Sequence, residues 1–128
     1  MDPFKTAGAF SWTELVTTDP AAAAEFYGRL FGWRIETSNL GTGPYRVVQA
    51  GGHAVGGIVG MPPGDAPMPP AWSAYVTVDD IDATLAACTA LGGQVLARPM
   101  VVPGVGRVAA IRDPQGAVLS IVCYAGSS

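Results

Sequence analysis

The chain has 128 residues, enough for one domain of ordinary size. It carries 7 Lys and Arg against 10 Asp and Glu, a net charge of −3, and 49% of its residues are hydrophobic. This composition argues against disorder, which needs low hydrophobicity and high net charge. An acidic chain with seven cations matches a nucleic-acid backbone poorly, so we expect no nucleic-acid partner.

Hydropathy and cysteine content predict a cytoplasmic protein. No run of 18 or more apolar residues is free of charge and proline, so we expect no membrane span. The first five residues lack the basic region and apolar run of a secretory signal. Cys88 and Cys123 lie in apolar surroundings without CxxC spacing, which predicts two buried thiols in a reducing compartment.

The first half of the chain predicts one strand, one helix and three further strands. A strand at residues 10–18 leads to Asp19 and Pro20, a helix N-cap followed by a proline at the first helical position. The alanine-rich helix ends at Gly32. Its apolar stripe consists of Ala22, Phe26 and Leu30. The shorter strands are expected at residues 33–37, 45–50 and 54–60.

A proline-rich linker, residues 62–70, separates this half from a second half with the same pattern. A strand at residues 72–78 precedes a helix that stops at Gly92 and Gly93. The stripe of this helix consists of Ile81, Leu85 and Cys88. Further strands are expected at residues 94–98, 107–112 and 117–123, the last two joined by a tight turn at residues 113–116.

The two halves repeat each other at an offset of sixty residues. The matching pairs are Trp12 and Trp72, Val16 and Val76, Thr17 and Thr77, Asp19 and Asp79, and Gly32 and Gly92. A single β-α-β-β-β unit cannot cover both faces of its sheet, so two such units must combine.

Three segments of this repeat carry a family resemblance: residues 19–33, residues 78–83 with 91–93, and residues 113–116. From about residue 9 to 124 the chain resembles the vicinal oxygen chelate superfamily, which includes glyoxalase I, extradiol dioxygenases, fosfomycin-resistance enzymes and bleomycin-resistance proteins. The resemblance implies a single α+β domain. Its two modules, residues 9–61 and 71–124, would form a U-shaped, eight-stranded cleft with the helices on the outer face. It also implies a homodimer with clefts near the subunit interface.

The same resemblance locates the positions where metal-dependent members hold their metal. These members place a His at the start of the first strand of each module and a Glu on the last strand. Here the three positions fall on Trp12, on Trp72 or Ser73, and on Ser120, and residues 58–61 offer no carboxylate as a fourth ligand. A divalent cation needs three or four ligands. We therefore expect no catalytic metal and no cofactor.

Strand alternation predicts which side chains line the cleft instead. Trp12, Glu14 and Val16 face the cleft if the alternate residues of their strand pack on the helix. In the second module the cleft face is either Ser73, Tyr75 and Thr77 or Trp72, Ala74 and Val76. The first set is favoured, and Trp72 would then lie at the strand mouth. The expected ligand-binding residues are Trp12, Glu14, Tyr45, His53, Met61, Trp72, Ser73, Tyr75, Arg107 and Ser120.

Three features leave alternatives open. His53, in a glycine-rich hairpin, is either a surface turn residue or a polar contact at the cleft rim. Glu14 is a general base, a hydrogen-bond acceptor for a ligand, or the partner of Arg34, Arg46 or Arg107. Residues 103–107 form a flexible loop, with a mobile lid as one option.

Two functions from different classes fit these residues. The first is metal-independent binding and sequestration of a hydrophobic, aromatic small molecule such as an antibiotic, as in the bleomycin-resistance branch. Flat aromatic walls suit a planar ligand. The alternative is a cofactor-free lyase, cyclase, isomerase or hydrolase acting on a polyketide-like substrate. In that case Glu14 would be the general base, with His53, Tyr45 or Tyr75 as the acid.

Overall fold

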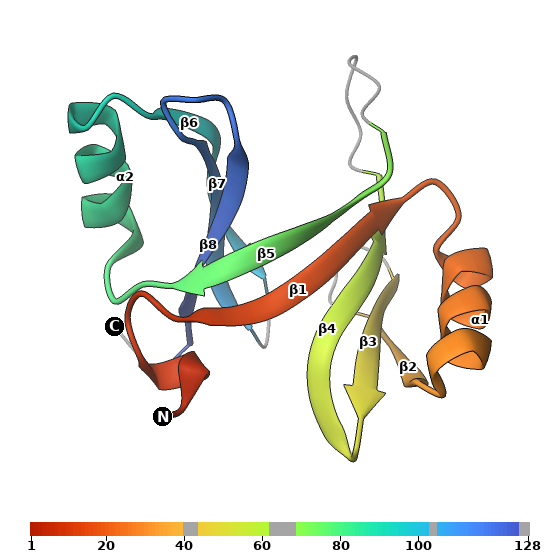
Figure 1. The fold of residues 1–128 in the computed structure, drawn as a ribbon. Helices are drawn as coiled ribbons and strands as arrows, with labels where there is room; N and C mark the ends of the chain where they lie inside the picture. Colours follow the sequence, from red (N-terminus) through yellow and green to blue (C-terminus); the bar gives the residue numbers. More distant parts are fainter. Residues whose placement is uncertain (40–43, 62–68, 103–104, 126–128) are drawn as a thin grey trace. The chain divides into compact units, whose positions relative to one another are not determined.

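The computed structural model describes residues 1–39, 44–61, 69–102 and 105–125 (Figure 1). Within them lie eight strands, two α-helices and a short 3-10 helix at Pro3–Lys5. The first module consists of β1 (Phe10–Thr17), α1 (Pro20–Phe31), β2 (Arg34–Asn39), β3 (Pro44–Ala50) and β4 (His53–Gly60). The second consists of β5 (Ala71–Thr77), α2 (Ile81–Ala90), β6 (Gln94–Val102), β7 (Gly106–Arg112) and β8 (Val118–Tyr124). The predicted α+β class and the β-α-β-β-β repeat are confirmed.

The four strands of each module lie in the same spatial order. In the first module the order is β2-β3-β4-β1, and in the second it is β6-β7-β8-β5. The first strand of each module runs parallel to the last, and the remaining pairs are antiparallel. Most of the proline-rich linker, residues 62–68, and the start of the predicted lid loop, residues 103–104, lie outside the described residues.

Contacts divide the chain into two compact units. One unit is Trp12–Ser73, and the other joins Met1–Ser11 to Ala74–Ser128. The first two residues of β1 thus belong with the second module, and the first three residues of β5 belong with the first. None of the helices in the described part of the chain has the length and apolar character to span a bilayer.

An aspartate caps each helix, as the sequence predicts. The Asp19 carboxylate accepts a hydrogen bond from the Ala22 amide at 3.0 Å, and the Asp80 carboxylate accepts one from the Ala83 amide at 3.0 Å. Each cap satisfies a backbone N–H that has no partner within its helix. Helix α1 ends at Gly32, whose φ of 72° is a left-handed conformation that glycine adopts without strain.

The caps correct the offset of the internal repeat. Asp80 is the N-cap of α2, so the structural counterpart of Asp19 lies 61 residues further on and not sixty. The same offset makes Ser73 the counterpart of Trp12. Trp72 is displaced by one residue and, since successive strand residues point to opposite faces, belongs to the other face of its strand.

One face of each sheet packs against the helix of its own module. The first core consists of Leu15, Val48 and Ile58, with Ala23, Ala24, Tyr27, Trp33 and Ile35 packed against it. The second consists of Ile81, Leu85, Ala109, Ile121 and Cys123. Burying these apolar side chains supplies the main stabilisation of each unit. Cys123 is buried as predicted, whereas Cys88 is only partly buried.

The apolar stripe predicted on α1 lies away from the sheet. Phe26 and Leu30 are 59% and 58% exposed, and α1 has no fully buried residue. Ala23, Ala24 and Tyr27 contact the sheet instead. Apolar residues fill both sets of helical positions, so their spacing alone could not decide between them.

The N-terminal segment packs against the second unit. The Thr77 hydroxyl donates to the carbonyl oxygen of Pro3 at 2.7 Å, and the Phe4 and Tyr124 rings meet edge to face at 5.2 Å. Burial raises the pKa of the Tyr124 phenol, although its hydrogen bond with Ser11 acts in the opposite direction. These contacts explain why the first eleven residues belong to this unit.

The two caps give a matched pair of stability predictions. Asp19→Ala and Asp80→Ala should each lower the free energy of unfolding by about 1 kcal/mol, because each leaves a helix N–H without its acceptor. The Asn variants should retain most of the stability, since the amide oxygen can accept the same bond. Urea unfolding followed by circular dichroism measures this. Equal losses for Ala and Asn would argue against capping as the cause.

Candidate functional site

The candidate site lies on the face of the first module's sheet opposite to α1. Leu15 and Ile58 point into the core beside α1. Their neighbours Glu14 and Gly57 are partners in the β1–β4 register, and Val47 is the partner of Gly57 on β3. Because adjacent strand residues alternate, these three positions share the face that α1 does not cover.

A chain of hydrogen bonds joins three of the predicted residues on this face. The Trp12 Nε1–H donates to the Tyr45 hydroxyl at 3.0 Å, and that hydroxyl donates to Glu14 Oε2 at 2.7 Å. All three side chains are partly buried. Trp12 and Glu14 come from β1 and Tyr45 from β3, so the fold brings together residues that are distant in sequence. The structure thus assembles three of the ten expected ligand-binding residues.

Gly57 makes room for this arrangement. Strand β4 lies between β1 and β3, so Tyr45 has to reach across it to meet Glu14. A Cβ atom on Gly57 would overlap the hydroxyl end of the Tyr45 ring and lie 2.7 Å from its Cε1. Sequence analysis missed Gly57 as a functional residue. Its signal was available, because a glycine inside a strand often marks the close approach of another group.

Two of the arginines considered as partners of Glu14 form other ion pairs. Arg34 lies 3.9 Å from Glu36 on β2, and Arg107 makes two contacts with Asp82 of α2, at 3.1 and 3.4 Å. The hydrogen bond that the Arg107 guanidinium donates to the Asp82 carboxylate is the main cause that raises the pKa of Arg107.

Trp72 belongs to a separate aromatic cluster beside α1. Its Nε1–H donates to the Tyr27 hydroxyl at 3.3 Å, and its ring meets Tyr27 and Trp33 edge to face at 5.3 and 6.0 Å. Tyr27 and Trp33 pack on the core that α1 covers. Trp12 lies in the hydrogen-bonded chain on the other face, so the two tryptophans do not form one platform.

Three further predicted residues lie on β5 and β8. Ser73 and Tyr75 are partly buried, and Tyr75 is the partner of Ser120 in the parallel β5–β8 register. Ser120 is buried. Tyr75 and Ser120 therefore occupy neighbouring positions in the second unit, and a ligand contact there stays a prediction.

His53 and Met61 lie at the two ends of β4. His53 is exposed and pairs with Ala50 across a two-residue turn. That turn consists of Gly51 and Gly52, with φ values of 59° and 80°. Such a turn favours glycine at both positions. Met61 is partly buried just beyond the strand. A rim contact by His53 stays a prediction.

The donor set at the family's metal positions does not fit a divalent cation. An indole N–H donates hydrogen bonds and offers no lone pair, and the Trp12 N–H is directed at Tyr45. The equivalent positions on β5 and β8 carry the hydroxyls of Ser73 and Ser120. Within residues 1–39, 44–61, 69–102 and 105–125, no three His, Cys, Asp or Glu side chains gather as a metal-binding group.

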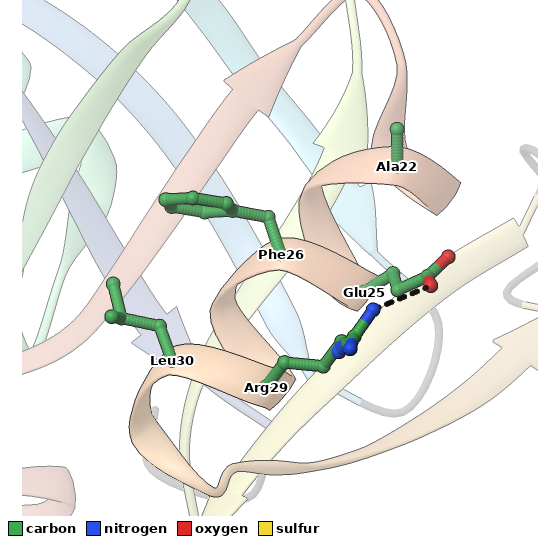
Figure 2. Close-up of a pocket in the computed structure, with 5 residues that line it drawn as sticks. All are labelled: Ala22, Glu25, Phe26, Arg29 and Leu30. Carbon is green, nitrogen blue, oxygen red and sulfur yellow. Dashed lines mark ion pairs between the residues drawn. The ribbon is translucent and has the colours of Figure 1, made fainter.

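A concave feature lies on the outer side of α1. It is a shallow hollow of about 500 Å³ lined by Ala22, Glu25, Phe26, Arg29 and Leu30. Figure 2 shows Phe26 and Leu30 projecting to the same side of the helix, while Glu25 and Arg29 form an ion pair at 3.7 Å. The hollow is the exposed stripe of α1 and is distinct from the chain of Trp12, Tyr45 and Glu14.

A family model confirms the resemblance that the sequence motifs indicate. Residues 9–121 match the model described as Glyoxalase/Bleomycin resistance protein/Dioxygenase superfamily. The chain belongs to this superfamily. A solved structure of methylmalonyl-CoA epimerase from Mycobacterium tuberculosis has the same fold, with a TM-score of 0.65 and 18% identity over 92% of this chain and 88% of that one.

Two longer relatives are more similar in sequence. "Putative glyoxylase CFP32" of Mycobacterium tuberculosis (strain CDC 1551 / Oshkosh) is 43% identical over 117 residues, which cover 90% of this chain and 44% of that protein. "Anthracycline biosynthesis protein DnrV" of Streptomyces peucetius is 35% identical over 127 residues, covering 89% of this chain and 46% of that protein. The chain thus spans less than half the length of either relative.

Substitutions at Gly57 and Tyr45 test the hydrogen-bonded chain. Gly57→Ala should displace the Tyr45 ring and shift the tryptophan emission spectrum, because Trp12 loses its hydrogen-bond acceptor. Tyr45→Phe should produce a similar shift and a stability loss of about 1 kcal/mol. Fluorescence and urea unfolding measure both effects.

Gly60→Ala, also on β4, is the control for a glycine substitution that leaves Tyr45 in place, because its Cβ would make only an ordinary contact with Pro20 at 3.7 Å. The Gly57→Ala shift should disappear when Tyr45 is already Ala. If it persists in that double variant, Gly57 does not act through Tyr45.

Proposed function

We propose that this chain binds and sequesters a hydrophobic, aromatic small molecule without using a metal. The observation that carries the proposal is the set of contacts among Trp12, Tyr45 and Glu14 on the sheet face opposite to α1. It combines two aromatic side chains with one carboxylate, and ligand sites in proteins are commonly apolar and aromatic with a few well-placed polar groups. Hydrogen bonds hold both rings in fixed positions, which reduces the entropy lost on binding.

The sequence relatives support the ligand class. The Streptomyces peucetius relative is named for anthracycline biosynthesis, and anthracyclines contain a planar polycyclic ring system. We propose that the ligand of this chain is likewise a planar aromatic natural product, such as an antibiotic. Sequestering it in the cytoplasm would protect the producing cell.

Tryptophan fluorescence tests the binding proposal. Titration with planar aromatic natural products should quench the emission, and Trp12→Ala should weaken binding by more than about 1 kcal/mol if its ring anchors the ligand. Trp72→Phe is the matched control, because Trp72 packs against Tyr27 and Trp33 in the other cluster. Absence of quenching and of affinity for every conjugated compound tried would overturn the proposal.

A cofactor-free enzyme is the second candidate, and one observation favours it. Tyr45 and Glu14 form a 2.7 Å hydrogen bond, a geometry in which a carboxylate and a phenol can act as base and acid on one substrate. Mass spectrometry of the recovered ligand separates the two candidates. Binding predicts an unchanged ligand after incubation, whereas catalysis predicts a product that Glu14→Gln fails to form.

We also propose that two copies pair through the exposed stripe of α1. The stripe is self-complementary: with two α1 helices antiparallel about a two-fold axis, Glu25 of one copy faces Arg29 of the other, and Phe26 and Leu30 pack between them. An exposed apolar patch of this kind commonly marks an interaction site.

Sedimentation equilibrium tests this interface. Phe26→Asp should weaken dimerisation by about tenfold or more, whereas Leu91→Asp, at another exposed leucine, should have little effect. Arg29→Glu should weaken the dimer through facing like charges, and the double variant Glu25→Arg with Arg29→Glu should restore it. A wild-type chain that stays monomeric at high concentration would refute the interface.

A further inference from the structure

The face of the second module's sheet opposite to α2 is covered at one end. Ile121 and Cys123 of β8 pack in the core beside α2, so Val122 between them points to the opposite face. Thr77 is the register partner of Val122 and shares this face. Both residues are almost fully buried, with 2% of Thr77 and 1% of Val122 exposed. Since α2 lies on the other side, another segment must cover them.

The N-terminal strap, residues 1–7, lies over this end of the face and belongs to the same compact unit. Its Pro3 carbonyl oxygen accepts a hydrogen bond from the Thr77 hydroxyl at 2.7 Å. The Phe4 ring meets that of Tyr124, which alternation puts on the same face. The 3-10 helix of the strap has no buried residue, and 37% of Phe4 is exposed. Because the strap buries little of its own surface, its detachment has a small cost in free energy.

The hydroxyl of Thr77 keeps an acceptor when the strap leaves. It lies 2.7 Å from the Pro3 carbonyl oxygen and 2.8 Å from Ser11 Oγ. A hydroxyl donates one hydrogen, so the two acceptors share it. Ser11 follows the strap in β1 and stays in place, and the Pro3 oxygen gains water as a partner. Detachment therefore leaves no buried donor without an acceptor.

Gly8 provides a pivot directly after the strap. Its φ of 88° lies in the left-handed region, which glycine enters and leaves without strain. The Gly8 amide donates to the Thr77 carbonyl oxygen, and the Thr77 amide donates to the carbonyl oxygen of Ala9, both at 2.8 Å. These bonds fix the chain where the strap ends, so the strap can swing while β1 keeps its position.

A planar ligand on this face needs the strap to move. Tyr75 and Ser120, two of the expected ligand-binding residues, form the next register pair on the same face as Thr77 and Val122. Residues two positions apart along a strand are separated by about 6.6 Å. A molecule of three or more fused rings is longer than this spacing, so one that rests on Tyr75 and Ser120 extends over the pair that the strap covers.

We propose that the N-terminal strap swings about Gly8 and regulates the access of a planar aromatic ligand to the face of β5 and β8 opposite to α2. The proposal rests on the proposed aromatic-binding function and adds its regulation. In the closed state the strap occupies part of the ligand's place. The measured affinity is then the intrinsic affinity reduced by the fraction of molecules with an open strap.

Proteolysis at Lys5 measures the opening. Lys5 is the single lysine of the chain and lies in the strap, so a lysine-specific protease cuts nowhere else. A protease binds several extended residues on each side of the bond it cuts, so cleavage requires the strap to leave the sheet, and its rate follows the open fraction. A saturating concentration of 9-anthracenemethanol, a neutral three-ring probe, should accelerate cleavage about fivefold or more, because the probe binds the open state.

The cut chain provides the second measurement. It begins at Thr6 and lacks both Pro3 and Phe4, so its face is open. It should bind the probe about fivefold or more tightly than the intact chain, as measured by the fluorescence of the probe. The two factors should agree, because each is the inverse of the open fraction. Circular dichroism before and after cleavage checks that the fold is retained.

A pair of glycine variants tests the pivot in the uncut chain. Gly8→Ala places a Cβ where φ is 88°, which disfavours the closed strap, so cleavage should accelerate and probe binding should tighten about twofold or more. Gly116→Ala is the matched control. Gly116 has a φ of 102°, a Cβ there would likewise meet nothing within 4 Å, and it lies at the opposite end of β8 from Tyr124. This control should lose similar stability and leave both measurements unchanged.

The outcomes separate the strap from the binding function. If the intact and cut chains bind the probe equally, or the cut chain binds it more weakly, aromatic binding stands and regulation by the strap is overturned. Slower cleavage of Lys5 in the presence of the probe also overturns it, because the probe would then favour the closed state. If neither the probe nor any other planar aromatic compound binds either form, the binding function itself fails, and the strap has no ligand to regulate.

Discussion

In the described part of the chain each module has one α-helix, and one helix can cover only one face of a sheet. This constraint decides the role of almost every strand residue, because neighbouring side chains on a strand point to opposite faces. Leu15 turns toward α1 and becomes core, so Glu14 turns away from it. A carboxylate on an uncovered face is stable only with a hydrogen-bonding partner or water, and Tyr45 supplies that partner.

The absence of one side chain completes the site. Tyr45 and Glu14 are on strands that are not adjacent, and β4 between them would ordinarily fill the space with its own side chains. Gly57 has no side chain to fill that space, so the Tyr45 ring occupies it. Two aromatic side chains and a carboxylate are thus held together by hydrogen bonds on this face. Other members of the superfamily use the same fold for metal chemistry, so the fold by itself does not specify what the site does.

Local signals in the sequence predicted most of the architecture. Aspartate caps, glycine stops and alternating strands located all eight strands and both α-helices of the described residues to within a few positions. Several details needed correction, among them the burial of Cys88, which is only partial. The stripe of Phe26 and Leu30 lies on the outer side of α1, and Ala23 and Tyr27, which have the same four-residue spacing, pack on the core. The sixty-residue repeat is one residue short, because Asp80 and not Asp79 caps α2.

The sequence by itself determined the repeated module and the superfamily, since each depends on residue types at fixed spacings along the chain. Only the tertiary structure decided that Trp12, Tyr45 and Glu14 meet while Trp72 packs with Tyr27 beside α1. The physical reason is that strand register sets which distant side chains become neighbours. A shift of one residue moves a tryptophan to the opposite face of the sheet.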